Sequence, residues 1–529
     1  MSKSISIKSD SSDSVLSILT DTLNMDKQAI VFVNTRRGAE SQAEKIAISI
    51  KTSDAKLINL SEAILKAVST PTKQCKRLAV CVKKGVAFHH SGLVSKQREL
   101  VEDNFRCGLI KVICATPTLA MGIDMPAFRV IIRDLKRYGG PWGMSDIPVL
   151  EYEQQAGRAG RPGKEDYGEA ICIAQTKGAK DKIFEKYING SVEDIFSKLA
   201  VEPVLRTHIL SLISSELVND KNSLFEFFDS TFYAHQYEDV GRLHQVLEKV
   251  IALLDEWGFI SVSNPNNGFV SAESLDAEGY NATMIGKRVS ELYLDPLTAH
   301  FMITCLQKAV SSKKIVDFSF FHMVASTLEI RPLLRVKMSE YELIQNELLK
   351  FEGLLLYDEP SSFDESYEEF LNSVKTSLFF NDWVDERDEE FLLETYSVRP
   401  GEIHAKLEIA DWLLYASVEL ARMLKLQFLL KDLLKARQRL KYGVKEELLP
   451  LLKLKGVGRV RARKMFNNKL KSLADLKTVD ITSLAQLIGK AAAISVKSQL
   501  GQEFDPLKVK VKENKRKGQT SLGHFVKKK

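Results

Sequence analysis

The chain has 529 residues, too many for one hydrophobic core, so several domains are expected. Hydrophobic residues make up 44% and charged residues 27%, and no run of about 18 apolar residues predicts a membrane span or a signal peptide core. The six cysteines are scattered without a C-x-x-C pair, which predicts reduced thiols of an intracellular protein and argues against disulfides or a zinc site.

Positive charge is concentrated near the C-terminus. Residues 506–529 hold nine basic residues and one acidic residue, so this tail has a net charge of +8. The whole chain has a net charge of +6, so the remaining residues together carry −2. Residues 422–471 hold 16 basic and three acidic residues, whereas residues 358–394 hold 13 acidic and two basic ones. The distribution favours a polyanionic partner, although a solvated helix surface with a soluble tail would also produce it.

The first 175 residues alternate between short apolar runs and helical patterns, which predicts an α/β doubly wound unit with a parallel sheet. Ligand-binding loops in such sheets follow the carboxyl ends of strands, where Thr35-Arg36-Arg37 and Thr116-Pro117-Thr118 fall. The expected strands are 29–33, 111–115, 129–132 and 169–174, and the expected helices are 41–50, 95–107 and 149–159.

The rest of the chain is mostly helical by pattern. A helical connection is expected up to about residue 198, and two strands, 257–262 and 268–272, flank an Asn/Gly turn and predict a β-wing behind helices. Residues 294–441 read as helices, with the acidic segment 358–394 as a surface excursion. A small helical module begins at Gly456-Val457-Gly458, and the basic tail after Pro506 is expected to be disordered.

Two glycine-flanked arginines, Arg158 and Arg161, lie in Gln154–Gly163, a segment suited to bind a phosphate group. This segment follows Ala115–Ala127 by about 30 residues. Together the two segments resemble motifs V and VI of superfamily 2 helicases, in which motif VI carries the arginine finger. Residues 31–40 and 88–93 are similar to motifs IV and IVa.

As a whole, the chain resembles archaeal Ski-like superfamily 2 DNA helicases, which are related to the helicase domain of polymerase theta. Residues 291–298 and the double-hairpin module at the end carry this resemblance beyond the motor motifs. It implies a multidomain α/β plus α fold, in this order: second RecA-like domain, 1–176; connecting helical segment, 177–200; winged helix, 201–292; helical ratchet domain, 293–441; helix-hairpin-helix domain, 442–505; basic tail, 506–529.

One departure from the family is large: the sequence has no G-x-x-x-x-G-K-[ST] loop to cradle phosphates. Residues 253–256 and 356–359 mimic a Walker B motif but lie outside the RecA-like region, and both are expected to be helical surface acids. The chain begins where the family's first RecA-like domain would end. It is therefore expected to be the C-terminal part of such a helicase and to be inactive alone.

The resemblance implies a shared nucleotide site. Arg158 and Arg161 would neutralise the γ-phosphate of ATP, although both could instead pair with interface carboxylates. ATP and Mg²⁺ would bind only with a first RecA-like domain present, which a separate gene could encode, and no structural metal is expected. The residues implied to contact the nucleotide are Gly122, Asp124 and Gln154.

The resemblance also implies several DNA contacts. Thr35, Arg36, His90, Thr116 and Thr118 would touch backbone phosphates, which carry no sequence code, although His90 could be structural. A strand-separating β-hairpin is expected at about 134–149, where a plain surface loop is the alternative. In the small module, phosphates would bind at Gly456, Gly458, Arg459, Arg461 and Arg463, where a purely structural role is the alternative.

The ratchet helix is expected to run through residues 402–412. Trp412 would stack on a base, with a core tryptophan as the alternative. The family has an arginine seven residues before this tryptophan, where this chain has Ala405, so Lys406 or His404 would supply the charge.

The last residues resemble a clamp-binding peptide. Gln519, Leu522, Phe525 and Val526 fit a PCNA-interacting box, except that Val526 replaces the usual second aromatic residue. The expected function is therefore the C-terminal part of an ATP-dependent 3′-to-5′ DNA helicase acting on forked or stalled replication DNA in repair. Its partners would be single-stranded and forked DNA and the sliding clamp, and no membrane contact is expected. The protein would act in the archaeal cytoplasm near the nucleoid. The alternative is an ATP-independent DNA-binding adaptor held by the clamp.

Overall fold

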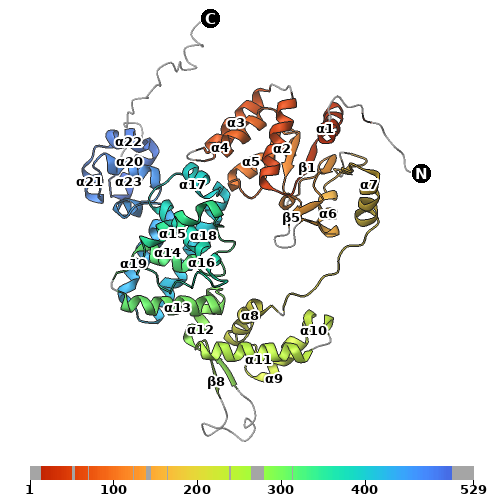
Figure 1. Cartoon of the computed structure of the whole chain (residues 1–529). Coiled ribbons are helices and arrows are strands. Elements are labelled where there is room, and N and C mark those ends of the chain that lie inside the picture. Colours follow the sequence, from red (N-terminus) through yellow and green to blue (C-terminus); the bar gives the residue numbers. More distant parts are fainter. Residues whose placement is uncertain are drawn as a thin grey trace. The chain divides into compact units, whose positions relative to one another are not determined.

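The computed structural model divides into two compact units. The first comprises Met1–Lys287 and Asp388–Lys406, and the second comprises Arg288–Arg387 and Leu407–Lys529. Figure 1 shows the chain coloured along its sequence. The residues described are 7, 13–50, 54–68, 71–122, 124–138, 144–161, 163, 165–199, 201–237, 240–263, 279–312 and 314–502.

A five-stranded sheet forms the centre of the first unit, with the strand order β2-β3-β1-β4-β7 and every neighbouring pair parallel. All residues of β1, β2, β3 and β4 are buried, as expected for a parallel sheet covered on both faces. The predicted α/β arrangement is confirmed. The strands are β1 (Ala29–Phe32), β2 (Val86–His89), β3 (Val112–Ala115), β4 (Arg129–Ile132) and β7 (Glu169–Cys172).

Helices cover this sheet: α2, α4 and α5 contact β2, and α6 contacts β4 (Figure 1). The helix after β1 begins at Arg36, five residues earlier than predicted, because the Thr35 hydroxyl accepts a hydrogen bond from the Gly38 amide at 3.0 Å. The helical elements are α1 (Ser14–Asn24), α2 (Arg36–Ser49), α3 (Ala55–Lys66), α4 (Lys73–Val82), α5 (Ser95–Arg106), η1 (Pro117–Leu119) and α6 (Val149–Ala156).

A short antiparallel hairpin lies where the sequence predicts one. It consists of β5 (Lys136–Tyr138) and β6 (Met144–Asp146), while residues 139–143 between them lie outside the described part. The side-chain nitrogen Nδ2 of Asn34, a residue that follows β1, donates to the carbonyl of Lys136 at 2.6 Å. This bond ties the base of the hairpin to the loop that precedes α2.

The connection after the sheet is helical only at first. The helix α7 (Lys177–Ile183) continues as a π-helical turn, η3 (Phe184–Ile188), and residues 189–199 are not helical. The prediction of a helix up to residue 198 is therefore wrong beyond residue 188. Glycine is required where the helix ends, since a Cβ at Gly190 would lie 1.9 Å from the Lys186 carbonyl oxygen.

Helices and a two-stranded sheet follow, and β8 pairs antiparallel with β9. The predicted second strand of the wing, 268–272, lies outside the described residues, and the partner of β8 is instead β9, farther along the chain. The elements are α8 (Glu202–Ser214), α9 (Lys221–Asp229), α10 (Phe232–Gln236), α11 (Val240–Glu256), β8 (Ile260–Ser263), β9 (Gly279–Ala282) and α12 (Met284–Glu291).

The second unit is helical, and α14, α16 and α19 pack on one another around buried phenylalanines such as Phe320 and Phe379. The acidic segment is a surface excursion only in part: residues 358–366 are irregular and largely exposed, whereas α16 buries Phe370, Leu371 and Val374. The helical elements between residues 296 and 442 are α13 (Pro296–Ser311), α14 (Asp317–Ala325), η6 (Met338–Glu340), α15 (Tyr341–Leu349), α16 (Tyr367–Val384), α17 (Glu389–Tyr396), α18 (Pro400–Met423) and α19 (Gln427–Tyr442). Of these, α17 and the start of α18, up to Lys406, belong to the first unit.

The two pairs of acids that mimic a Walker B motif differ in structure. Asp255 and Glu256 are exposed at the end of α11, as predicted. Asp358 and Glu359 are also exposed, but they lie in an irregular segment and not in a helix, so that part of the prediction is wrong. Neither pair follows a strand of the parallel sheet.

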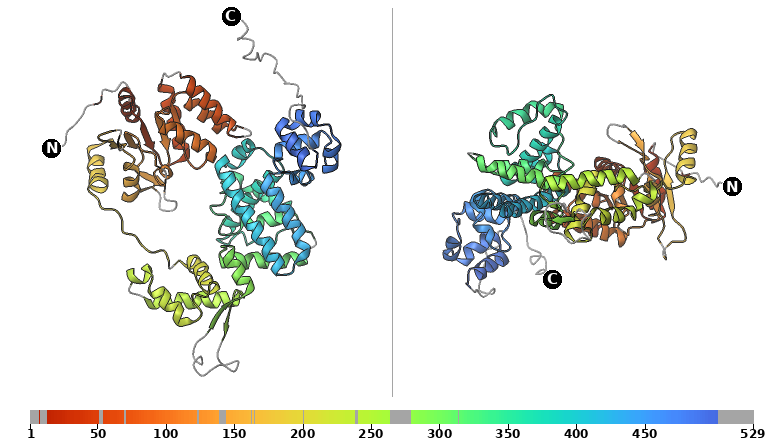
Figure 2. Two further views of the ribbon diagram at one scale, coloured as in Figure 1. Left: turned by 180° about the vertical axis from the view of Figure 1, so that it is seen from behind. Right: turned by 90° about the horizontal axis from the view of Figure 1, so that it is seen from below.

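The last described residues form a small helical module with a core of its own, in which Val457, Leu476 and Leu484 are buried. Figure 2 shows these blue helices gathered together in both views. The elements are η7 (Glu446–Leu448), η8 (Leu451–Lys453), α20 (Arg459–Asn467), α21 (Leu473–Thr478), α22 (Ile481–Ile488) and α23 (Lys490–Gln499). All six cysteines are unpaired, and none of the described helices is long and apolar enough to cross a bilayer.

Candidate functional site

Three predicted DNA-contacting loops lie side by side at the carboxyl edge of the sheet. They follow β1, β2 and β3, which are neighbours in the order β2-β3-β1. Backbone hydrogen bonds hold the loops at this edge, from the Val33 amide to the Ala115 carbonyl at 2.9 Å and from the Thr116 amide to the His89 carbonyl at 3.2 Å. The fold thus brings together Thr35, Arg36, His90, Thr116 and Thr118.

The hydroxyl groups in this row are differently exposed. Thr35 is exposed at the N-terminus of α2, which it caps. Thr116 is nearly buried, at 8% exposure, and its hydroxyl lies 2.9 Å from the hydroxyl of the exposed Thr118. A phosphate at this edge could therefore reach Thr35 and Thr118, with Thr116 orienting the Thr118 hydroxyl.

His90 points into the protein interior. Its ring is fully buried, its Nδ1 accepts from the Gly92 amide at 3.1 Å, and its Nε2 lies 3.3 Å from a carboxylate oxygen of Glu40. Since Nδ1 accepts, the proton belongs on Nε2, where it faces Glu40. Burial lowers the pKa of His90, so the ring is neutral at pH 7. This geometry favours the structural alternative for His90 over a phosphate contact.

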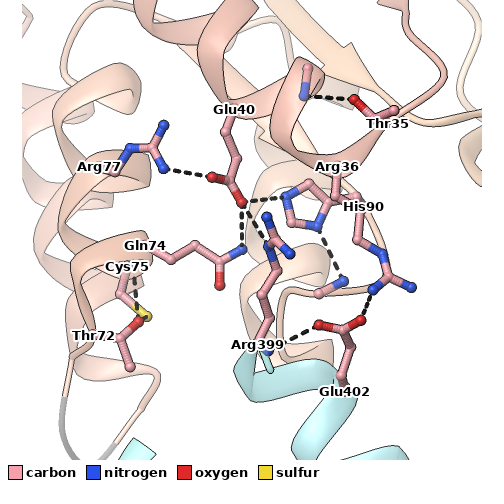
Figure 3. A network of polar contacts seen from close by, with 12 residues as sticks. Thr35, Arg36, Glu40, Thr72, Gln74, Cys75, Arg77, His90, Arg399 and Glu402 are labelled. Atoms are coloured by element: carbon pink, nitrogen blue, oxygen red, sulfur yellow. Dashed lines mark hydrogen bonds and ion pairs between the residues drawn. The ribbon is translucent and has the colours of Figure 1, made fainter. Parts of the chain in front are cut away.

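Glu40 is the centre of the network drawn in Figure 3. Its buried carboxylate accepts hydrogen bonds from the side chains of Arg77 at 2.6 Å, Arg399 at 3.0 Å and Gln74 at 3.2 Å. The ring of His90 also contacts it. Burial by itself raises the pKa of Glu40, but the contacts with His90 and Arg399 outweigh burial and lower it to about 2. The carboxylate is therefore ionised at every physiological pH.

The network includes a segment that is distant in sequence, the start of α18. Arg399 reaches Glu40, Glu402 pairs with Arg36, and the Gly401 amide donates to the Gly92 carbonyl at 3.1 Å. Sequence reasoning assigned no role to Glu40, Arg399 or Glu402. Because Glu40 and Arg399 lie 359 positions apart, no local pattern could pair them.

The two predicted catalytic arginines lie at the opposite, amino edge of the sheet. The Ala127 amide, just before β4, donates to the Arg158 carbonyl at 2.9 Å, which fixes the arginine loop there. The Arg158 guanidinium donates to the Ala120 carbonyl, with Nε at 3.2 Å. Arg161 donates to the side-chain oxygen of Gln28, the residue immediately before β1.

A cavity of about 640 Å³ opens beside these arginines, and its lining includes Gln28, Arg106, Asp124, Arg158 and Arg161. Four basic or amide side chains and one carboxylate therefore face it. The Nε of Arg161 is buried without a hydrogen-bond partner among the described atoms. An unpaired guanidinium nitrogen beside a cavity fits the oxygens of a phosphate group.

The predicted nucleotide contacts differ in position. Asp124 lines the cavity with its side chain 97% exposed, and Gly122 lies nearby in sequence with a φ of +76°, which favours glycine. Gln154, in α6, does not line the cavity, and its side-chain oxygen is buried without a partner among the described atoms. Asp124 is thus placed to contact a ligand in the cavity, whereas Gln154 is not.

One segment connects the two edges of the sheet. Residues 116–126 leave the carboxyl end of β3 with Thr116 and Thr118 and reach the amino side of β4 with Asp124 and Met125, which line the cavity. Arg158 holds this segment midway through the carbonyl of Ala120. Arg158 therefore contacts the same segment that carries the two threonines.

The predicted ratchet helix is α18, which includes all of residues 402–412. His404 and Ala405 are exposed, and burial lowers the pKa of Lys406 to about 8. Trp412 is half-buried, and its indole nitrogen donates to the Leu292 carbonyl at 3.1 Å. The hydrogen bond supports a packing role for this residue.

The arginines of the C-terminal module are not equivalent. Arg463 pairs with Glu386 at 2.7 Å and with Glu447 at 2.7 Å, and the Arg459 guanidinium lies 5.0 Å from the Trp383 ring centre. Arg461 is exposed and donates only to the Gly456 carbonyl among the hydrogen bonds described. No side chain caps the α20 N-terminus at Gly458, and Gly456 has a φ of +82°. Arg461 is therefore the arginine best placed for a phosphate.

The predicted clamp-binding residues, Gln519, Leu522, Phe525 and Val526, lie outside the described part of the chain. Within the described residues, no group of three or more histidine, cysteine, aspartate or glutamate side chains is placed to hold a metal ion.

The sequence is similar to known helicases. Residues 12–163 match the helicase conserved C-terminal domain, and residues 318–443 match domain 4 of archaeal helicases. The chain is 38% identical to the ATP-dependent DNA helicase Hel308 of Methanococcus vannielii, over 94% of this chain and 69% of that protein. Hel308 proteins of Methanocella arvoryzae and Pyrococcus abyssi are 37% and 36% identical, over 97% and 96% of this chain and 68% of each relative.

Proposed function

This chain belongs to the archaeal Hel308 family of superfamily 2 DNA helicases, and we propose that it is the DNA-translocating part of a 3′-to-5′ helicase. Its substrate would be forked or stalled replication DNA in replication-coupled repair, in the cytoplasm near the nucleoid. The observation that carries the proposal is the pair of sites at opposite edges of one sheet, joined by residues 116–126.

At the amino edge, Arg158 and Arg161 would bind the charge that grows on a phosphate group during ATP hydrolysis. Bound ATP with Mg²⁺ would supply the energy of translocation. Arg161 is suited to this role because it lines the cavity together with Arg158 and Arg106. The sequence contains no phosphate-cradling G-x-x-x-x-G-K-[ST] loop, so we expect hydrolysis only together with a first RecA-like domain.

At the carboxyl edge, Thr35, Arg36, Thr116 and Thr118 would hold the phosphates of the tracking strand, without reading its sequence. The remaining domains would guide DNA: residues 201–292 as a winged helix, 293–441 as a ratchet domain with Trp412 as its stacking residue, and 442–505 as a helix-hairpin-helix domain. The hairpin of β5 and β6 would separate the strands, and residues 519–526 would bind a sliding clamp.

The proposal is tested by ATPase measurements on the purified chain with single-stranded DNA. We expect no turnover from the chain alone and DNA-stimulated turnover after addition of a first RecA-like domain from a Hel308 relative. Arg161→Ala should then lower turnover about a thousandfold, since a catalytic arginine stabilises the transition state. Arg335→Ala, a change at an 82% exposed side chain, should leave turnover unchanged.

Two outcomes would contradict this scheme. Turnover by the chain alone at the rate of a complete helicase would show that no further domain is needed. DNA binding without turnover, even after a functional first domain has been added, would favour the alternative, an ATP-independent adaptor held on DNA by the sliding clamp.

A further inference from the structure

Arg36, one of the proposed phosphate-binding residues, is already paired with a carboxylate. Its guanidinium forms an ion pair with Oε1 of Glu402, in the first turn of α18 (Figure 3). A carboxylate and a phosphate present the same charge sign and similar acceptor geometry to a guanidinium group. Glu402 therefore occupies the position that a phosphate oxygen of DNA would take.

The pair is open to solvent, unlike its neighbour. The side chains of Arg36 and Glu402 are 37% and 27% exposed, whereas Glu40, the partner of Arg399, is only 4% exposed. A phosphate arriving from solvent could thus displace Glu402 from Arg36. The pair between Arg399 and Glu40, together with the hydrogen bond from the Gly401 amide to the Gly92 carbonyl, would stay closed.

Glu402 keeps a hydrogen bond when Arg36 is withdrawn. Its other carboxylate oxygen, Oε2, accepts from the backbone amide of Arg399 at 2.9 Å, a capping contact at the start of α18. A carboxylate is also favoured near the positive end of a helix. Releasing Arg36 therefore leaves Glu402 satisfied, so the exchange with a phosphate needs no rearrangement of the helix.

We propose that Glu402 competes with the tracking-strand phosphate for Arg36 and so sets the affinity of this helicase for single-stranded DNA. The inference rests on the proposed role of Arg36 in DNA binding. Each time a phosphate occupies Arg36, the first turn of α18 loses one of its ties to α2. Since α18 continues to Lys406 and Trp412, this helix would sense whether the phosphate site is occupied.

The test is the affinity of the full chain for a fluorescent single-stranded oligonucleotide, measured by anisotropy at one salt concentration. Glu402→Gln should tighten binding about threefold to tenfold, because the competing charge is gone while an amide oxygen remains to cap the helix. Glu402→Asp keeps the charge but is shorter, so it withdraws from Arg36 and should also tighten binding. Unfolding midpoints should confirm that both variants fold.

The matched control is Glu394→Gln, which removes one acid from an ion pair with Lys73 in the same unit but does not touch Arg36. Its affinity should equal that of the wild type. In Arg36→Ala, binding should weaken, and adding Glu402→Gln to it should give no gain.

The outcomes separate the two ideas. If Arg36→Ala weakens binding but Glu402→Gln gives no gain, the competition is overturned while the DNA role of Arg36 stands. A gain from Glu402→Gln that persists without Arg36, or that Glu394→Gln reproduces, would reduce the effect to general charge and overturn the competition. If Arg36→Ala binds like the wild type, both ideas are overturned.

Discussion

Glu40 shows how a single buried carboxylate can hold a site together. Isolated, its charge would be expensive to bury, yet two arginines, a glutamine and a histidine face it. The folded pKa of about 2 lies below the ordinary value of 4.5, so the ionised form stabilises the fold. This contribution is fully present above about pH 4.5 and is lost as the pH falls toward 2.

We predict that Glu40→Gln lowers the free energy of unfolding by on the order of 3 kcal/mol at pH 7, since one pKa unit corresponds to about 1.4 kcal/mol. The measurement is urea unfolding of both proteins between pH 7 and pH 2. The difference between them should shrink below pH 4.5, where the wild-type carboxylate begins to take up its proton.

Glu62→Gln is the control for this prediction, because Glu62 pairs with Lys66 on an exposed helix surface and should change stability by less than about 0.5 kcal/mol. A difference between wild type and Glu40→Gln that stays constant from pH 7 to pH 2 would mean that packing, and not charge, is what the glutamine disturbs.

Residues could be predicted from the sequence where their chemistry is local. Thr35 and Thr116 were placed correctly at strand ends because each follows a short apolar run, and a parallel sheet aligns such ends at one edge. The environment of His90 could not be predicted, since it depends on Glu40 and on burial. The contacts of Arg399 and Glu402 could not be predicted either, because their partners are in α2, hundreds of residues away in the sequence.

At the scale of elements, strongly patterned segments were the predictable ones. The runs that became β1, β3 and β4 were recognised by their continuous apolar residues, and α5 was placed within one residue at its end. The strand β2 was not named, because its apolar run, Val86–Phe88, is only three residues long and is followed by two histidines. Charge misled the reading of α16, whose buried face outweighs the acids near its ends.

Trp412, in α18, is half-buried and donates a hydrogen bond to the Leu292 carbonyl, and we propose that it also stacks on a base of the DNA. We predict that Trp412→Phe keeps most of the affinity for single-stranded DNA, because an aromatic face remains. Trp412→Ala should weaken binding by about 1–3 kcal/mol, the usual contribution of stacking on one base. Anisotropy titrations of both variants with a single-stranded oligonucleotide provide the measurement.

Both substitutions should cost about 1 kcal/mol or more of stability through the lost hydrogen bond, so unfolding must be measured alongside binding. If both variants bind DNA like the wild type and differ only in stability, Trp412 is a packing residue and the stacking role is wrong.

At the scale of the whole molecule, the proposed nucleotide and DNA sites at the two edges of the sheet belong to the same compact unit. The arginine loop, residues 116–126 and the three carboxyl-edge loops are all in the first unit, as is the beginning of α18 up to Lys406. The rest of α18 belongs to the second unit. The helix α18 therefore contributes residues to both units.

Positive charge is concentrated at one end of the molecule. Residues 506–529 have a net charge of +8, and they contain the candidate clamp-binding residues. In one turn of helix, Leu522 and Phe525 would share a face that fits an apolar pocket, whereas Lys527, Lys528 and Lys529 could not enter it. Such a tether would raise the local concentration of the motor at replication sites without adding DNA specificity.

We predict that a synthetic 506–529 peptide binds the cognate sliding clamp with a Kd on the order of micromolar, as short linear motifs commonly do. Phe525→Ala should abolish binding, because it removes the main apolar anchor, whereas Lys528→Ala should weaken it by less than about threefold. Calorimetric titrations at low and high salt provide the measurement. Equal losses from both substitutions, together with binding that vanishes at high salt, would mean that the tail acts only as a polycation.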